Sequence, residues 1–189
     1  MMKYISTLTV FMIICLLLVF PPGIVNGSVS IHDIRILNNE KDVVVYAVLT
    51  DGFSKEMESA IMAGVPTTFT FTLKTYQEKS WWPDKKMSHV TIKHTMKYDN
   101  VKQTFSVTSA DNGQEAVFSD FDAAKRAMSE LSGIAVVPIG DLTKGSSYYI
   151  RMKAKLEKYR PPSVLRYIFF FTSPGDFETG WSLKHRFIY

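Results

Sequence analysis

The stretch Tyr148-Tyr149-Ile150-Arg151-Met152-Lys153-Ala154-Lys155-Leu156-Glu157 alternates apolar with polar or charged side chains. Successive side chains of a β-strand point to opposite faces, so this alternation predicts a long strand with one buried and one hydrated face. The same two-residue period recurs in residues 68–74, where phenylalanine and leucine alternate with threonine and lysine, and again in residues 89–96. The period therefore indicates a mainly β protein.

Further strands are expected on both sides of these three. Apolar alternation, continuous apolar runs or flanking turn residues mark them at residues 28–37, 43–49, 101–107, 115–118, 134–137 and 178–188. The continuous runs at 43–49 and 134–137 are typical of strands covered on both faces. In the first strand the apolar phase shifts near His32 and Asp33, which indicates a β-bulge.

Two short helices are expected to interrupt this pattern, over residues 54–63 and 119–133. In the second, Ser119 and Asp120 resemble a capping box, and Gly133 is a candidate for the closing residue. The apolar residues fall on one side of each helix: Met57, Ala60 and Ile61 in the first, and Phe121, Ala124, Met128 and Leu131 in the second. Both helices are therefore expected to lie against a sheet.

These elements together predict the fold class: mainly β, an antiparallel β-sandwich of immunoglobulin-like or similar type, with two short covering helices. Residues 28–189 are expected to form a single β-sandwich domain. A chain of about 160 residues can bury roughly 70% of its unfolded surface, which is enough for one core without disulfides.

The first 27 residues predict export. Lys3 gives a positive start, residues 5–20 are almost wholly apolar, and Pro21-Pro22 ends any helix. The apolar run lies between the length of a signal-peptide core, about 7–15 residues, and that of a spanning helix, about 20 residues. Residues 1–27 are thus a signal peptide or an N-terminal anchor in the inner membrane. We favour cleavage after Gly27, and an extracytoplasmic, periplasmic location for the domain.

Composition excludes several classes of site. Cys15 is the only cysteine, so residues 28–189 can hold no disulfide, thiol nucleophile or cysteine-ligated metal. The formal net charge of +4 is spread along the chain and does not favour a nucleic-acid partner. The sequence has no GxSxG, HExxH, P-loop or GxGxxG motif. We therefore predict no catalytic residue, no metal site and no cofactor.

The histidines and paired carboxylates are explained by structural roles. His89 and His94 are five residues apart on one expected strand, so they face opposite sides and cannot bind one metal together. His94 is in phase with Met96 and is expected to be a hydrogen-bonded core residue, whereas His89 and His185 are expected at the surface. Asp120 and Asp122 are explained by the start of a helix.

Two aromatic segments are the candidates for a binding surface. Trp81 and Trp82 join two expected strands, and neighbouring side chains of an extended chain point opposite ways. We expect one tryptophan to pack against the protein and the other to be partly exposed. The favoured interpretation is that the packed ring plugs one end of the sandwich. An exposed tryptophan beside Lys85-Lys86 would suit a glycan, a peptide or the membrane interface. Phe169, Phe170 and Phe171 belong to an apolar run that is either buried, which we favour, or exposed for a partner.

A set of short segments also occurs in a characteristic order: Leu49-Thr50-Asp51-Gly52-Phe53, Gly64-Val65-Pro66-Thr67-Thr68-Phe69, Trp81-Trp82, Lys97-Tyr98-Asp99, Leu165-Arg166-Tyr167, Asp176-Phe177-Glu178-Thr179 and Trp181. Together they resemble an uncharacterised bacterial family, domain of unknown function 4390, over nearly all of residues 28–189. The resemblance implies an exported or anchored protein of Gram-negative bacteria whose gene often neighbours a membrane sensor histidine kinase. It implies no activity and no catalytic residue.

Three functions remain open. The first is a non-catalytic extracytoplasmic binding or accessory module at the inner-membrane surface, with a membrane or periplasmic protein, such as a sensor histidine kinase, as partner. The second is a cell-envelope module that binds glycan or lipid through Trp81 or Trp82 and the Phe169 to Phe171 region. A hydrolytic enzyme ranks third. A flat apolar patch would favour the first, a groove with an exposed tryptophan the second, and a deep polar pocket the third.

Overall fold

The computed structural model describes residues 28–110, 113–157 and 177–189, whose strands form two antiparallel sheets. The strands are β1 (Ser30–Asn38), β2 (Asp42–Thr50), β3 (Thr67–Gln77), β4 (Lys85–Asp99), β5 (Thr104–Ser109), β6 (Glu115–Phe118), β7 (Glu130–Pro138), β8 (Ser147–Glu157) and β9 (His185–Ile188). The helices are α2 (Lys55–Met62) and α3 (Phe121–Ser129), and a 3-10 turn, η1, covers Ile139–Asp141. The predicted mainly β class with two short helices is confirmed.

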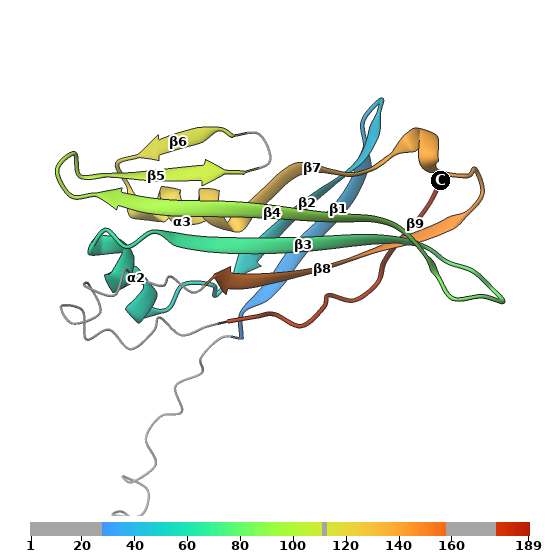
Figure 1. Ribbon diagram of the computed structural model, residues 1–189, viewed down its shortest axis with the longest axis horizontal. Helices are drawn as coiled ribbons and strands as arrows, with labels where there is room; N and C mark the ends of the chain where they lie inside the picture. The colour runs from blue at the N-terminus through green and yellow to red at the C-terminus, as the bar shows by residue number, and fades with distance from the viewer. Residues whose placement is uncertain (1–27, 111–112, 158–176) are drawn as a thin grey trace, which may run out of the picture.

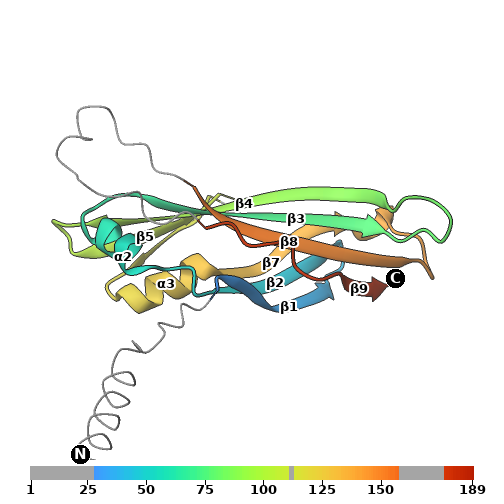
Figure 2. The same cartoon turned by 90° about the horizontal axis from the view of Figure 1, so that it is seen from below.

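The smaller sheet has the order β1-β2-β7 and the larger has the order β6-β5-β4-β3-β8-β9 (Figure 1). One sheet curls into a half-barrel. Seen from below, β3, β4 and β8 lie over β1, β2 and β7, with the two helices toward one end (Figure 2). The long central strands are thus held between a shared core on one face and solvent on the other.

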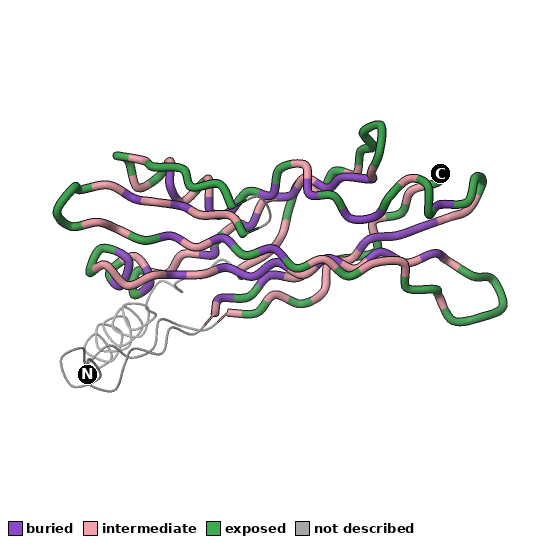
Figure 3. Tube along the Cα trace, turned by 45° about the horizontal axis from the view of Figure 1, so that its top comes forward, coloured by how far each residue is buried: buried purple, intermediate pink, exposed green. Residues whose placement is uncertain are grey.

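The core lies between the two sheets and follows the predicted alternation. Ile150, Met152 and Ala154 of β8 are completely buried, and so are Phe69 and Leu73 of β3. Figure 3 shows buried and exposed segments alternating along the strands. The expectation of strands covered on both faces holds only locally, because β2 is buried continuously at residues 43–45 and alternates beyond them. The alternation thus leaves one face of β3, β4 and β8 free to carry polar side chains.

The predicted bulge in the first strand is confirmed. The pairing of β1 with β2 shifts register between His32 and Arg35, and Asp33 has a φ of 51°. His32 itself is exposed and is hydrogen-bonded to Ser30 at 2.8 Å. The bulge is therefore an irregularity in the pairing of β1 with β2 in the smaller sheet.

Helix α2 forms as predicted. Ser54 caps it by accepting a hydrogen bond from the amide of Met57 at 3.2 Å. Met57, Ala60 and Ile61 are all buried. In α3 the cap is Asp120, which accepts from the amide of Ala123 at 2.8 Å. The helix-start role expected for Asp120 is thus confirmed, although the helix begins at residue 121.

The predicted end of the second helix is wrong. Helix α3 ends at Ser129, so Leu131 lies on β7 opposite Ala47 of β2. Leu131 is fully buried, as expected, but it reaches the core from a strand. Gly133 does not close the helix: it has a φ of 69° within β7, where the register with β2 shifts. Pairing with β2 takes the backbone groups that a longer helix would need.

Two strand boundaries also differ from the expectation. Val101 lies in the turn after β4 and is 94% exposed, so the next strand starts only at Thr104. The expected strand 178–188 is a single bridge at Glu178 followed by β9. Between them the hydroxyls of Thr179 and Ser182 accept hydrogen bonds from β8 amides, at 2.9 Å and 3.1 Å, in place of backbone carbonyls. A regular ladder therefore does not form there.

No helix among the described residues is long and apolar enough to cross a membrane. The predicted signal peptide or anchor, residues 1–27 with the apolar run 5–20, lies outside the described residues. The candidate surface residues Phe169, Phe170 and Phe171 also lie outside them.

Candidate functional site

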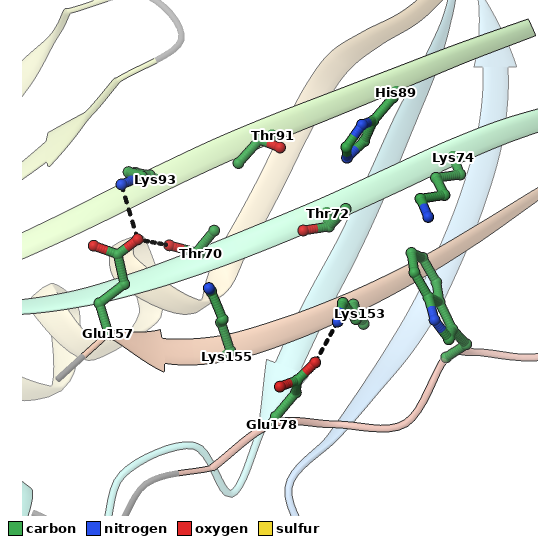
Figure 4. A pocket seen from close by; sticks show the side chains of 11 residues that line it. Thr70, Thr72, Lys74, His89, Thr91, Lys93, Lys153, Lys155, Glu157 and Glu178 are labelled. Carbon is green, nitrogen blue, oxygen red and sulfur yellow. Dashed lines mark hydrogen bonds and ion pairs between the residues drawn. The ribbon is translucent and has the colours of Figure 1, made fainter.

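A shallow hollow of about 510 Å³ lies on the solvent face of the larger sheet, across β4, β3 and β8 (Figure 4). We call it the cationic groove, and it is lined by Thr70, Thr72, Lys74, His89, Thr91, Lys93, Lys153, Lys155, Glu157, Glu178 and Trp181. Its strand residues are the polar members of the alternation, so the period that builds the core on one face builds the groove on the other.

Strand register places these side chains in rows across the sheet. Thr70 pairs with Lys93 on one side and with Lys155 on the other. The next row is Thr91, Thr72 and Lys153. Neighbouring strands lie about 4.8 Å apart, so the side chains of one row can contact a single small group together.

The groove carries an excess of positive charge. The lining contains four lysines and two glutamates, so its formal charge is +2 when His89 is neutral. Glu157 is held by Lys93, whose Nζ lies 2.8 Å from its Oε1, and by the hydroxyl of Thr70, which donates at 2.7 Å. These hydrogen bonds, that from Lys93 first, lower the pKa of Glu157. Glu157 is therefore ionised at neutral pH and its charge is already paired.

One wall of the groove is the segment 177–184, which we call the C-terminal segment. Its Glu178 pairs with Lys153, and the hydrogen bond from Lys153 lowers the pKa of Glu178. Trp181 draws further cations together: Lys74 Nζ lies 4.7 Å from the ring centroid, Lys153 Nζ 5.3 Å, and the Arg151 guanidinium carbon 5.8 Å. Cations at these distances are attracted by the ring quadrupole. Trp181 thus contacts two of the four groove lysines, Lys74 and Lys153.

Trp81 and Trp82 form a second exposed feature, at the tip of the β3–β4 hairpin. Their exposed fractions are 93% and 79%, so the expectation that one tryptophan packs as a plug is wrong. The strands end at Gln77 and restart at Lys85, and the intervening chain bends rather than continuing as a strand. The alternation of faces on which the prediction rested therefore does not apply.

The base of this loop is fixed by Asp84. Its carboxylate accepts hydrogen bonds from the Tyr149 hydroxyl at 2.9 Å and the Lys79 amide at 3.2 Å, and Lys184 Nζ lies 3.3 Å away. Tyr149 also stacks on Tyr76, with ring centroids 5.1 Å apart. Burial, together with the Asp84 bond, raises the pKa of Tyr149 to about 12, and the bond from Tyr149 lowers the pKa of Asp84. The tryptophan tip therefore has an anchored base.

The histidines lie as the sequence predicted, with one exception. His94 is buried, and its Nδ1 donates to the carbonyl of Met128 at 3.0 Å. His89 is exposed on the opposite face and lines the cationic groove. His185 is partly buried rather than on the surface, and this burial lowers its pKa. Asp122, placed at the helix start by the sequence, pairs with Lys125 at 2.9 Å.

Among the described residues no group of three or more histidine, cysteine or acidic side chains could hold a metal ion. The sequence analysis did not identify Trp181 and the lysines around it as candidate site residues. The sequence feature that points to these residues is the threonine and lysine content of three hydrated strand faces. These residues form one site only because the three strands pair side by side.

The structure thus defines a two-sheet, mainly β protein with an open charged groove and an exposed aromatic tip. A family model matches residues 26–183, and the chain belongs to the family described as domain of unknown function (DUF4390). The family predicted from the sequence is confirmed. No curated protein and no solved structure matches the chain.

Proposed function

We propose that this protein is a non-catalytic binding or accessory module that docks on a membrane or periplasmic protein through Trp81 and Trp82. The observation that carries the proposal is the pair of adjacent tryptophans, 93% and 79% exposed, on one hairpin tip. Tryptophan is enriched among the few residues that carry most of an interface's binding energy, at about 2 kcal/mol or more each. Single exposed apolar residues are common, but two adjacent large rings are an exposed patch that fits a partner.

The anchored base of the loop supports the same function. Asp84 ties the loop to Tyr149 of β8 and to Lys184 of the C-terminal segment. A loop whose base is ordered before binding loses less conformational entropy when it docks. The tip is therefore suited to recognition as a pre-formed element.

The environment and partner are proposed from the sequence. Residues 1–27 favour an extracytoplasmic position, either released into the periplasm or anchored at the inner membrane. The family resemblance favours the outer domain of a sensor histidine kinase as partner. We also propose that the two sheets form an immunoglobulin-like or similar sandwich, which is supported by their shared core.

A second candidate is binding to lipid or glycan of the cell envelope. It is favoured by Lys79, Lys85 and Lys86, which are exposed on either side of the two tryptophans. Tryptophan with nearby lysine is the usual combination at a membrane interface, where the ring lies at headgroup level. In this case the same tip would contact anionic lipid instead of protein.

Catalysis is the least supported function. Hydrolases that use two carboxylates need one of them protonated as a general acid, with a raised pKa. Glu157 and Glu178 both have lowered pKa values, because lysines pair with them. Each glutamate therefore favours charge pairing over proton transfer.

The test is a pull-down from native membranes with the double variant Trp81→Ala/Trp82→Ala. We expect recovery of the partner to fall by more than about tenfold, because each ring should contribute about 2 kcal/mol or more. The matched control is Val101→Ala, which truncates a side chain of 94% exposure at the other end of β4. If the double variant keeps its thermal stability and returns the same partners in the same amounts, the tip is not the docking surface. Binding of the parent, but not the double variant, to phosphatidylglycerol vesicles would assign the tip to lipid.

A further inference from the structure

We propose that the cationic groove binds a phosphate group, as a site separate from the tryptophan tip. The argument begins with charge. The groove's formal excess is two positive charges, and a phosphate monoester carries about −1.5 to −2 at pH 7. One phosphate therefore neutralises the groove, whereas a carboxylate supplies only half of that charge.

The distribution of the lysines shows where the anion binds. Lys93 and Lys153 are each paired with a glutamate. Lys155 is exposed, and Lys74 contacts the face of Trp181 rather than a carboxylate. Among the described residues, neither has a hydrogen bond or ion pair to its side chain. Lys74 and Lys155 are consequently the two cations available to a ligand.

A hydroxyl lies between these two lysines, because Lys155 is in the row of Thr70, Thr72 is in the next row and Lys74 is in the row after that. Thr72 is on the same strand as Lys74, two residues before it, and it pairs with Thr91 across the sheet. Lysine ammonium groups bind phosphate as point charges with three donors each. Two lysines, the Thr72 hydroxyl between them and the Thr91 hydroxyl beside it thus offer donors to the oxygens of a phosphate.

The charge of the segment that follows β8 in the sequence does not complement the groove. Residues 158–176 follow β8 directly, and their sequence has Lys158, Arg160 and Arg166 against Asp176 alone. A basic and apolar segment would add to the excess charge instead of neutralising it. The occupant is therefore an anion from outside the chain, either a lipid headgroup or a soluble phosphorylated molecule.

The experiment uses Trp181 as the reporter. The chain has three tryptophans, so the full chain with Trp81→Phe/Trp82→Phe keeps Trp181 as its sole indole. We expect pyrophosphate to change its emission saturably at constant ionic strength, because the ligand draws Lys74 away from the ring. Acetate at the same ionic strength should have no such effect.

Two variants made in this background locate the site. Lys74→Gln/Lys155→Gln should weaken pyrophosphate binding by about tenfold or more, since two charge-assisted contacts are lost. Its affinity is measured by isothermal titration calorimetry, because the fluorescence response depends on Lys74. Lys41→Gln/Lys144→Gln removes the same charge from exposed positions outside the groove and should bind like its parent. Equal pyrophosphate affinities of the two variants, or a saturable fluorescence response of their parent to acetate, would overturn the proposal.

Vesicles separate the two sources of phosphate. The chain with its native tryptophans is mixed with vesicles of phosphatidylcholine, with or without phosphatidylglycerol. Binding that requires phosphatidylglycerol and is lost in Lys74→Gln/Lys155→Gln assigns the phosphate to lipid, and this variant retains residues 1–27 as an internal control. Pyrophosphate binding without vesicle binding assigns it to a soluble ligand. If polyglutamate binds the groove as tightly as polyphosphate at equal salt, phosphate recognition is wrong.

Discussion

Replacing Phe69 with alanine is expected to lower the free energy of unfolding by about 3–5 kcal/mol. Phe69 is completely buried near the start of β3, between Leu156 of β8 and His94 of β4. Its ring centroid lies 5.1 Å from that of Phe53 and 5.2 Å from that of Phe177. Its removal leaves a cavity that several elements must close together, so little of the lost packing can be recovered.

Urea unfolding followed by far-ultraviolet circular dichroism measures this loss. The control is Val117→Ala on edge strand β6, which is 64% exposed and should cost less than about 0.5 kcal/mol. A loss under about 1 kcal/mol for Phe69→Ala would mean that the core is not organised around β3. Because Phe177 opens the C-terminal segment, the same variant should also loosen the wall of the cationic groove.

Replacing Leu131 with alanine is expected to cost about 2–5 kcal/mol of the same free energy. Leu131 is fully buried on β7 and faces Ala47 of β2, where it joins the two sheets at the end of α3. The neighbouring Ser132 is exposed, so Ser132→Ala is the matched control and should be close to neutral. A cost below about 0.5 kcal/mol for Leu131→Ala would place this corner outside the core.

Leu131 also shows what a local pattern can predict. Its burial follows from its phase with Phe121, Ala124 and Met128, and that part of the prediction is correct. Whether residue 131 belongs to a helix or a strand depends on β2, which is about 80 residues earlier in the chain and takes its backbone hydrogen bonds. Local spacing identifies which side chains are apolar and in phase, but tertiary pairing selects the backbone that presents them.

The cationic groove could not be predicted from the sequence, because it too depends on which strands pair. Thr70, Lys93 and Lys155 were each recognisable as members of a hydrated strand face. Their meeting in one row requires that β3 be the neighbour of both β4 and β8, and the pairing of Thr70 with Lys155 joins strands that are far apart in sequence. No composition or spacing encodes that register, so the site could not be assembled before the fold was known.

The prediction that one of the two tryptophans packs was wrong for a different reason. Trp81 and Trp82 are both exposed, whereas the plug interpretation assumed that the chain stays extended through them. The strand ladder stops at Gln77 and Lys85, so both rings point away from the core. Loop residues lie beyond the reach of strand periodicity, and here the resulting exposure is what supports the proposed function.

Photo-crosslinking from Ser80 tests the central claim most directly. Ser80 is exposed and precedes Trp81, so a photoreactive residue there leaves both tryptophans intact. The control position is Val101, at the opposite end of β4 and about 50 Å away at roughly 3.3 Å per residue. The account predicts an adduct with a membrane or periplasmic protein from position 80 that is absent from position 101 and lost in Trp81→Ala/Trp82→Ala. Identical adducts from both positions, or an adduct from position 80 that survives loss of both tryptophans, would contradict it.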